Sequence, residues 1–101
     1  MDREAFVEQV LAVVESIPPG RVMSYGAIAD AVGVGGPRQV GQVLALYGGP
    51  VPWWRVVRAD GTPPVCHAGE AYAHYRRERT PLRQGGADRP RIDMEKAGWR
   101  R

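Results

Sequence analysis

The sequence has almost no cysteine. Cys66 is the only cysteine among the 101 residues, so no disulfide can form within the chain. A chain without a disulfide suits a reducing compartment such as the cytoplasm. The same scarcity excludes zinc fingers, which need several cysteine or histidine ligands. Cys66, His67 and His74 are too few ligands for a metal site, so no metal is expected.

Long apolar runs are also missing. No stretch approaches the roughly 18 consecutive apolar residues of a transmembrane helix, so we expect no membrane partner. Residues 1–4 are charged and lead into an amphipathic pattern rather than into a signal peptide. The length predicts one domain with a core large enough to be stable without disulfides, and we expect a monomer.

Positive charge is concentrated in the last third of the chain. Residues 1–30 contain two basic and five acidic side chains, whereas residues 67–101 contain nine basic and five acidic ones. Thirteen of the fourteen basic residues are arginine, whose planar guanidinium pairs with phosphates and stacks on bases. This distribution favours a polyanionic partner on one side of the protein, and a merely solvated arginine face is the open alternative.

The apolar spacing predicts two helices before residue 33. Residues 2–17 carry apolar side chains three and four positions apart, and the proline and glycine residues at 18–20 end this helix. Residues 21–23 form a short link that can be extended. Ser24 is a suitable N-cap for a second helix over residues 25–32.

A glycine-rich turn and a third helix follow. Residues 33–36 form the turn, and Pro37 suits the first position of a helix that extends to about Tyr47. Glycine and proline at 48–50 stop it. Two short helices joined by a glycine-containing turn are typical of a helix-turn-helix, although many helical bundles share this pattern.

The second half of the chain has weaker signals. Val56–Val57 and a turn at Asp60–Gly61 predict a small β ribbon or wing. A helix is expected from about residue 67 to 79, and residues 80–90 are rich in proline, glycine and arginine, as in a loop. Residues 91–101 add either a short strand or a loose end.

Two adjacent tryptophans lie in the stretch Val51–Val57. Pro52, before Trp53 and Trp54, fixes its own φ and biases Val51 toward extended backbone. Neighbouring side chains of an extended segment face opposite ways, so we expect at least one indole to line a pocket or surface. A core tryptophan with an exposed neighbour is the alternative.

Three separated motifs carry a family resemblance. They are Met23–Ser24–Tyr25–Gly26–Ala27–Ile28–Ala29, Pro37–Arg38–Gln39–Val40–Gly41–Gln42–Val43–Leu44 and Val51–Pro52–Trp53–Trp54–Arg55–Val56–Val57. Their order and spacing resemble the DNA-binding domain of O6-alkylguanine-DNA alkyltransferases, which have Ser-Tyr-Gly, Arg-x-Val-Gly and Pro-Cys-His-Arg-Val. The resemblance covers about residues 2–75. It implies a mainly α, winged-helix-like bundle with a helix-turn-helix and a small β ribbon, as one domain over 1–101 whose residues 79–101 form a looser extension.

Trp53 and Trp54 depart from the enzymes of this family. In the enzymes, the residue at Trp53 is the cysteine that accepts the alkyl group, and the residue at Trp54 is a histidine that activates it. An indole offers neither a usable lone pair nor an exchangeable proton at neutral pH. The chain therefore resembles the alkyltransferase-like proteins, which bind alkylated DNA without repairing it, although those proteins usually keep the histidine. The resemblance implies no catalytic residue and no cofactor.

The resemblance implies a role in DNA damage recognition. The protein would bind double-stranded DNA that contains O6-alkylguanine and flip the nucleotide out, at a cost of roughly a few kcal/mol. It would then hand the lesion to nucleotide excision repair proteins. The protein would be cytoplasmic and associated with the nucleoid when bound to DNA. Arg38 matches the family's arginine that fills the gap left in the base stack. Tyr25 matches the tyrosine that crowds the phosphate beside the flipped nucleotide. The implied DNA-binding residues are Tyr25, Arg38, Gln39, Gly41 and Gln42, and the implied lesion-pocket residues are Tyr25, Val51, Pro52, Trp53, Trp54, Val56, Cys66 and His67.

Roles within the tryptophan stretch also follow from the resemblance. Trp53 would form a pocket wall, and Trp54 either packs beneath that wall or constricts the pocket. Arg55 would hold the loop by hydrogen bonds. The enzymes use a buried glutamate late in the chain to orient the histidine, and no residue of this sequence is a clear match. A chain carrying Trp53→Cys and Trp54→His is therefore expected to transfer an alkyl group slowly.

Two other functions are open at this point. Cys66–His67 is a second cysteine–histidine pair, so an active alkyltransferase that uses Cys66 is one alternative. The pair lacks the following Arg-Val, and by the family alignment it falls in the lid loop that covers the flipped base. A winged-helix transcription regulator is the other alternative, which explains the helix-turn-helix and the charge but not the tryptophan stretch.

Overall fold

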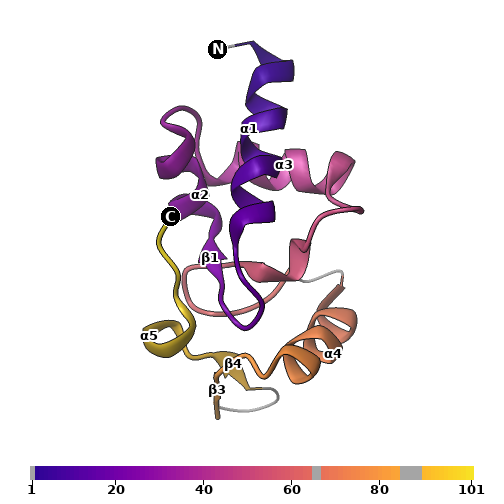
Figure 1. Ribbon diagram of the computed structural model, residues 1–101, viewed down its shortest axis with the longest axis vertical. Coiled ribbons are helices and arrows are strands. Elements are labelled where there is room, and N and C mark those ends of the chain that lie inside the picture. The colour runs from indigo at the N-terminus through magenta and orange to yellow at the C-terminus, as the bar shows by residue number, and fades with distance from the viewer. Residues whose placement is uncertain (1, 65–66, 85–89) are drawn as a thin grey trace.

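Five short helices dominate the part of the chain that the structure describes, residues 2–64, 67–84 and 90–101 of a computed structural model. The helices are α1 (Arg3–Ser16), α2 (Tyr25–Val32), α3 (Pro37–Tyr47), α4 (Ala68–Glu78) and α5 (Met94–Ala97), and a 3-10 turn, η1, covers Trp53–Arg55. The strands are β1 (Met23–Ser24), β2 (Val56–Val57), β3 (Leu82–Arg83) and β4 (Arg91–Ile92). Helices α1, α2 and α3 pack together at one end of the molecule, and α4, α5 and the β3–β4 pair lie at the other (Figure 1). The predicted mainly α class is confirmed.

Local capping explains the first two helices. Asp2 accepts a hydrogen bond from the Ala5 N–H at 2.8 Å at the start of α1, and Ser24 accepts one from the Ala27 N–H at 3.0 Å at the start of α2. Gly33 ends α2 with a φ of 92°, a left-handed conformation that glycine adopts without strain. Helices α2 and α3 therefore form the predicted helix-turn-helix. Among the described helices, none has the length and apolar composition needed to span a bilayer.

Two apolar clusters hold these elements together. The first cluster joins α1, α2 and α3 to the residues around η1, and its buried members are Val10, Val13, Val14, Ile17, Met23, Ile28, Ala29, Val40, Val43, Val51 and Val56. The second joins β2 and α4 to the C-terminal residues, and its buried members are Val22, Val57, Ala71, Tyr72, Tyr75, Ile92 and Ala97. Removing this apolar surface from water is the main force that fixes the elements relative to one another.

The strands pair differently from the sequence prediction. β2 forms a parallel pair with β1, in which Met23 is opposite Val56, so Val56–Val57 does not begin a hairpin. The turn predicted at Asp60–Gly61 does form, with the Gly61 N–H donating to the Arg58 carbonyl at 2.9 Å. The antiparallel ribbon consists instead of β3 and β4. Burial of the valine strand decides this, because both of its side chains lie in the core.

Of the two alternatives for residues 91–101, the short strand is confirmed, as β4, and the residues after it pack against the link between α1 and β1. The Val22 N–H donates to the Ala97 carbonyl at 2.9 Å, and the Val22 carbonyl accepts from the Trp99 N–H at 2.8 Å. Ala97 is fully buried. The loop predicted over 80–90 is also interrupted, because β3 lies within it. Two-residue strands have no periodicity that a sequence pattern could reveal.

Candidate functional site

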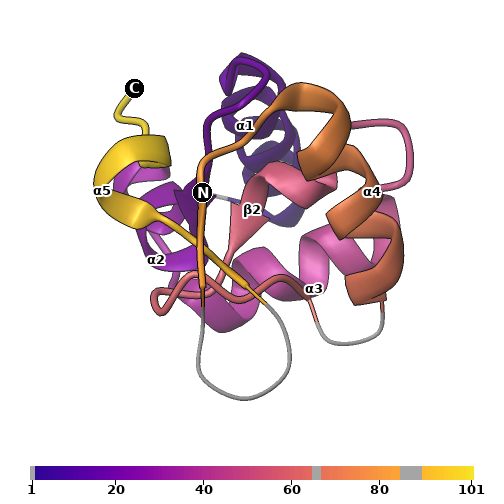
Figure 2. The same ribbon diagram turned by 90° about the horizontal axis from the view of Figure 1, so that it is seen from below.

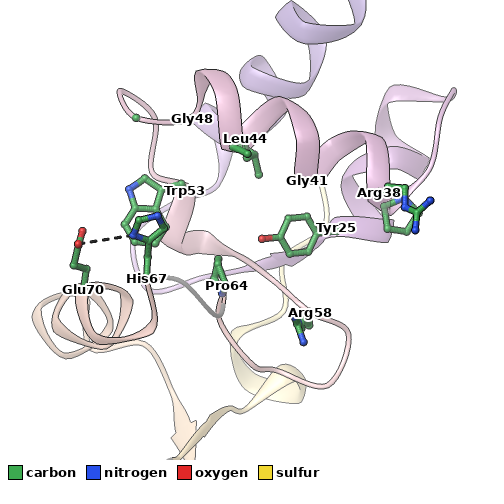
Figure 3. A pocket seen from close by; sticks show the side chains of 13 residues that line it. Tyr25, Arg38, Gly41, Leu44, Gly48, Trp53, Arg58, Pro64, His67 and Glu70 are labelled. Carbon is green, nitrogen blue, oxygen red and sulfur yellow. Dashed lines mark ion pairs between the residues drawn. The ribbon is translucent and has the colours of Figure 1, made fainter.

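A cavity of about 810 Å³ opens between α3, η1 and the start of α4. Trp53 and His67 lie at one end of it, Arg38 and Arg58 lie toward the other, and Tyr25 lies between (Figure 3). Its lining combines aromatic rings at one end with two guanidinium groups at the other. Such a cavity can hold a planar aromatic group while anionic groups stay beside the cations.

Five of the predicted site residues meet in this cavity. Tyr25, Arg38, Gly41, Trp53 and His67 all line it, although they come from four separate parts of the sequence. Tyr25, Arg38 and Gly41 belong to the helix-turn-helix. Trp53 belongs to η1, and His67 directly precedes α4. The cavity therefore brings together the parts of all three sequence motifs.

Gln39 and Gln42 are exposed on α3 and do not line the cavity. The Gln39 side-chain oxygen accepts a hydrogen bond from the Gly36 N–H at 2.9 Å. It therefore closes the turn that precedes α3, a role that the sequence prediction did not include.

Four further predicted pocket residues are placed elsewhere among the described residues. Val51 and Val56 are buried in the first apolar cluster, Pro52 is half-buried, and Trp54 turns toward α4. None of the four lines the cavity. Cys66, predicted as a pocket residue and as the alternative nucleophile, lies outside the described residues.

The two adjacent tryptophans diverge because they lie in a tight turn and not in the extended segment that the sequence predicted. The Trp53 N–H donates to the Val51 carbonyl at 2.7 Å, and the Arg55 N–H donates to the Pro52 carbonyl at 3.0 Å. The indoles meet edge to face, with ring centroids 5.7 Å apart and planes at 86°. Trp53 lines the cavity, which confirms that at least one indole lines a pocket.

Trp54 packs behind Trp53, the first of the two alternatives left open. His74 of α4 lies flat on Trp54, with centroids 3.6 Å apart and planes at 5°, and meets Trp53 edge to face at 6.0 Å. Burial lowers the pKa of His74, and the charge of Arg77 lowers it further. The neutral ring is thus favoured at neutral pH, with Nδ1 accepting from the Arg77 guanidinium at 2.9 Å. Two stacked rings therefore support the cavity wall.

The sequence prediction missed Glu78, which lies behind the cavity wall, and also Arg58 and Glu70, which line the cavity. The Glu78 carboxylate accepts hydrogen bonds from Trp54 Nε1 at 3.0 Å, from Arg55 Nε at 3.0 Å and Nη2 at 2.5 Å, and from the Gly20 N–H at 3.1 Å. The side chains of Arg55 and Glu78 are 13% and 10% exposed, so the ion pair is largely shielded from water. Burial raises the pKa of Glu78, but the hydrogen bonds from Arg55, Gly20 and Trp54 outweigh it and leave the pKa below its usual value.

A signal for Glu78 was present in the predicted helix. Ala71, Tyr75 and Glu78 are spaced four and three residues apart, so they share one face of α4, and both Ala71 and Tyr75 are fully buried. The Tyr75 hydroxyl donates to the Trp54 carbonyl at 2.7 Å, and burial raises the pKa of Tyr75. One face of α4 therefore holds the η1 turn in place.

Arg55 has the predicted role of holding the loop. Besides its pair with Glu78, its Nη1 donates to the Ile17 carbonyl at 2.9 Å, at the end of α1. The guanidinium thus connects three segments, and the prediction that it acts through hydrogen bonds is confirmed.

Tyr25 and Gly41 form the middle of the cavity. Burial raises the pKa of Tyr25 and nearby Arg58 offsets part of that rise, so the phenol is protonated at neutral pH and can donate a hydrogen bond. A Cβ at Gly41 would lie 4.0 Å from Tyr25 Cε1, in ordinary contact with the ring. Glycine therefore leaves this part of α3 open above the tyrosine.

His67 and Glu70 form the rim beside Trp53. The His67 ring centroid is 5.5 Å from that of Trp53, with the planes tilted by 58°, and His67 Nδ1 is 3.9 Å from Glu70 Oε1. Both side chains are mostly exposed. Within residues 2–64, 67–84 and 90–101, no group of three or more His, Cys, Asp or Glu residues is arranged to hold a metal ion.

Comparison with known sequences identifies one family. The model for the DNA binding domain of 6-O-methylguanine DNA methyltransferase matches residues 5–84. A DNA base-flipping protein of Vibrio parahaemolyticus is 39% identical over 61 residues, which cover 57% of this chain and 61% of that protein. A DNA base-flipping protein of Escherichia coli is 41% identical over 66 residues, which cover 61% of this chain and 51% of that protein. The chain thus spans less than two thirds of the length of these curated relatives.

Two crystal structures of a fission yeast protein are similar over the whole chain. The structure of S. pombe Atl1 in complex with damaged DNA containing O6-carboxymethylguanine has a TM-score of 0.85 and 30% sequence identity, and the match covers 100% of both chains. The structure of S. pombe ATL in complex with DNA matches equally well. The structural likeness therefore extends past residue 84, where the family match ends, to the described residues 90–101.

Proposed function

The chain belongs to the 6-O-methylguanine DNA methyltransferase family, as an alkyltransferase-like member, and from this premise we propose that it recognises O6-alkylguanine in duplex DNA by base flipping. Its fold, including the helix-turn-helix, is the winged-helix fold of that family. The damaged nucleotide would leave the duplex and enter the cavity beside Trp53. The observation that carries the proposal is the Trp53 indole at the end of this cavity. The family resemblance implies that the enzymes have their reactive cysteine at this position.

The size and lining of the cavity support this occupant. A volume of about 810 Å³ lies within the range of roughly 300–1,000 Å³ that small-molecule sites occupy. The base would lie against Trp53, with its alkyl group on the apolar indole face and His67 at the rim. Extrusion costs a few kcal/mol and is easiest for a badly paired base, which favours damaged guanine over normal guanine.

Arg38 and Tyr25 would act on the DNA strand that loses the nucleotide. Arg38 lies in the first turn of α3 and is exposed, so its guanidinium can enter the vacated stack and hydrogen-bond the orphaned cytosine. Tyr25 lies between Arg38 and Trp53, where its hydroxyl can crowd the phosphate of the turned-out nucleotide. The positive end of the α3 dipole favours the neighbouring phosphates.

Retention without repair follows from the residues at the cavity end. An indole at position 53 has no thiolate to accept an alkyl group, so the lesion would stay intact on the bound DNA. We propose that residues 1–101 act as one non-enzymatic domain, as a monomer in the cytoplasm and on the nucleoid when bound. Nucleotide excision repair would then remove the lesion, as the resemblance implies.

Binding and transfer assays test the proposal together. We expect the protein to bind a duplex with one O6-methylguanine more tightly than the same duplex with guanine, and to leave a radiolabelled methyl group on the DNA. Equal affinity for the two duplexes would favour a transcription regulator. Label on the wild-type protein that disappears in Cys66→Ala would favour an active alkyltransferase.

Glu78 revises the expectation for a restored enzyme. The five-membered ring of an indole superimposes on an imidazole so that Trp54 Nε1 coincides with the Nε2 position of a histidine. In Trp54→His, that nitrogen would face Glu78, now 3.0 Å from Trp54 Nε1, as the orienting glutamate does in the enzymes. We therefore expect Trp53→Cys with Trp54→His to transfer methyl groups on the order of 10²-fold faster than Trp53→Cys alone, the lower end of general acid–base contributions.

The single-turnover rates of both variants on one methylated duplex measure this difference. Trp53→Ala with Trp54→His is the matched control, because it has the imidazole without the thiol and should transfer nothing. Equal rates for Trp53→Cys and the double variant would show that position 54 does not serve as the base.

A further inference from the structure

Two arginines face each other across the β3–β4 ribbon. Arg83 of β3 is directly opposite Arg91 of β4 in the antiparallel register, and both side chains are exposed. Like charges directly opposite each other destabilise an antiparallel pair. The ribbon has only one other residue pair, Leu82 with Ile92, so this repulsion acts on half of it. The arrangement is unfavourable in the free protein and becomes favourable beside a polyanion.

A tight turn connects this ribbon to the cavity. The Arg58 N–H donates to the Thr62 carbonyl at 2.9 Å, which closes the turn. The Ile92 N–H of β4 donates to the Gly61 carbonyl of the same turn, also at 2.9 Å. Arg58 also lines the cavity. The turn that contains Arg58 therefore contacts the cavity with one residue and β4 with another.

Asp60 shows that the charges of the turn and the ribbon act on one another. Its carboxylate accepts hydrogen bonds from the Thr62 hydroxyl and N–H, which lower the pKa of Asp60, and the cations of Arg91 and Arg58 lower it further. Among the described residues, the ion pairs are Arg55–Glu78 and His67–Glu70, so Arg58, Arg83 and Arg91 have no carboxylate within 4.0 Å there. Within the described residues of this turn and of β3 and β4, three guanidinium groups outnumber one carboxylate, so their net charge is positive.

The ribbon opens toward the side of the molecule on which α3 lies. In Figure 2, β3 (orange) ends and β4 (yellow) begins at the lower side of the view, the side on which α3 is also seen, although Figure 1 shows that the ribbon and α3 lie at different heights along the long axis. The Ile92 N–H of β4 meets the Gly61 carbonyl of the segment that follows β2. The C-terminus lies at the upper side of the same view. Arg83 is the last residue of β3 and Arg91 the first of β4, so both belong to the end of the ribbon that is seen on the same side of this view as α3.

We propose that Arg58, Arg83 and Arg91 form a phosphate-binding patch that contacts the DNA backbone beside the flipped nucleotide. This arginine patch rests on the proposed function, because it needs a duplex docked on α3. Contacts to phosphates position a protein on DNA but do not read the base, so the patch adds affinity for damaged and undamaged duplex alike. Each phosphate contact also steepens the salt dependence of binding, by about 0.9 in the slope of log K against log salt.

Salt titrations of a double variant test the patch. For Arg83→Gln with Arg91→Gln, we expect the slope to fall by about 1.8 and the affinity in 0.1 M salt to fall on the order of tenfold for each lost contact. The loss should be equal on O6-methylguanine and guanine duplexes, so the ratio of the two affinities stays unchanged. Arg100→Gln with Arg101→Gln is the matched control, since it removes the same charge from the C-terminus at the opposite side of Figure 2, and should leave the slope unchanged.

Stability separates a lost contact from a damaged fold. Either single variant removes the whole repulsion across the ribbon, so each should raise Tm by about 1–5 °C, and the double variant should raise it little further. Losses in DNA affinity should instead add, because each arginine contacts its own phosphate. Asp60→Asn keeps the acceptor for Thr62 and removes the negative charge, so it should bind DNA about two- to fivefold more tightly.

The outcomes are distinct from those of the proposed function. A double variant with the salt slope of the wild type, or a loss no larger than that of the C-terminal control, would overturn the arginine patch. If the wild-type protein binds damaged and undamaged duplex with equal affinity, the proposed function is overturned. The arginine patch could then still be measured on undamaged duplex.

Discussion

Glu78→Ala is expected to destabilise the protein by about 3–5 kcal/mol, the usual cost of removing one partner from a buried ion pair. The variant would leave the Arg55 guanidinium without its carboxylate in a site where both side chains are only 13% and 10% exposed. It would also leave the Trp54 and Gly20 N–H groups without the acceptor they share. A domain of this size has a total stability of about 5–15 kcal/mol, so a large part of it is at stake.

Urea unfolding followed by tryptophan fluorescence measures this loss. Glu70→Ala is the matched control, because Glu70 is on the same helix but 72% exposed, and a surface change of this kind stays within about 0.5 kcal/mol. The stability loss of Glu78→Gln should lie between those of Glu78→Ala and Glu70→Ala, since an amide oxygen still accepts hydrogen bonds but carries no charge. A Glu78→Ala variant within about 1 kcal/mol of the wild type would contradict the role of Glu78 as the central acceptor of the site.

The pKa of Glu78 adds a pH dependence with a definite sign. The folded protein holds this carboxyl at a pKa below its usual value, so folding stabilises the ionised form. The resulting stability is fully present above the unfolded glutamate pKa of about 4.3 and is lost as the pH falls through the lower folded value. Unfolding midpoints measured from pH 6 to pH 3 should therefore decline less steeply for Glu78→Gln than for the wild type.

Arg38→Ala is expected to weaken binding to O6-methylguanine duplex by about 1–3 kcal/mol, or roughly 5- to 150-fold. On damaged DNA the variant would lose both the stacking of the guanidinium in the gap and its charge-assisted bond to the orphaned cytosine. On undamaged duplex Arg38 supplies only backbone charge, so the loss there should be smaller. Fluorescence anisotropy with the two duplexes, at one fixed salt concentration, gives the two losses directly.

Two further variants sharpen this test. Arg38→Lys keeps the charge but not the planar group, so it should recover binding to undamaged duplex and little of the preference for damage. Arg3→Ala removes one exposed arginine from the start of α1, away from the cavity, and should affect neither duplex strongly. Equal losses on both duplexes for Arg38→Ala would reduce this residue to a phosphate contact.

The sequence by itself determined the first three helices and α4 to within one or two residues. Their signals are local: Ser24 caps α2 through a residue three positions away, Gly33 supplies the left-handed turn, and Pro37 opens α3. The order and spacing of three motifs were also enough to identify the family. Such signals involve only a few neighbouring residues, so they can be recognised in the sequence without knowing which distant segments pack against them.

Only the tertiary structure decided how distant segments meet at the cavity. Trp54 and Glu78 are 24 residues apart, and their hydrogen bond depends on α4 packing against η1, which no local pattern specifies. The parallel β1–β2 pair and the β3–β4 ribbon are two residues long, too short to have a periodicity of their own. Packing chooses among the possible partners of such short elements, because burial of apolar area depends on the whole arrangement and not on any one segment.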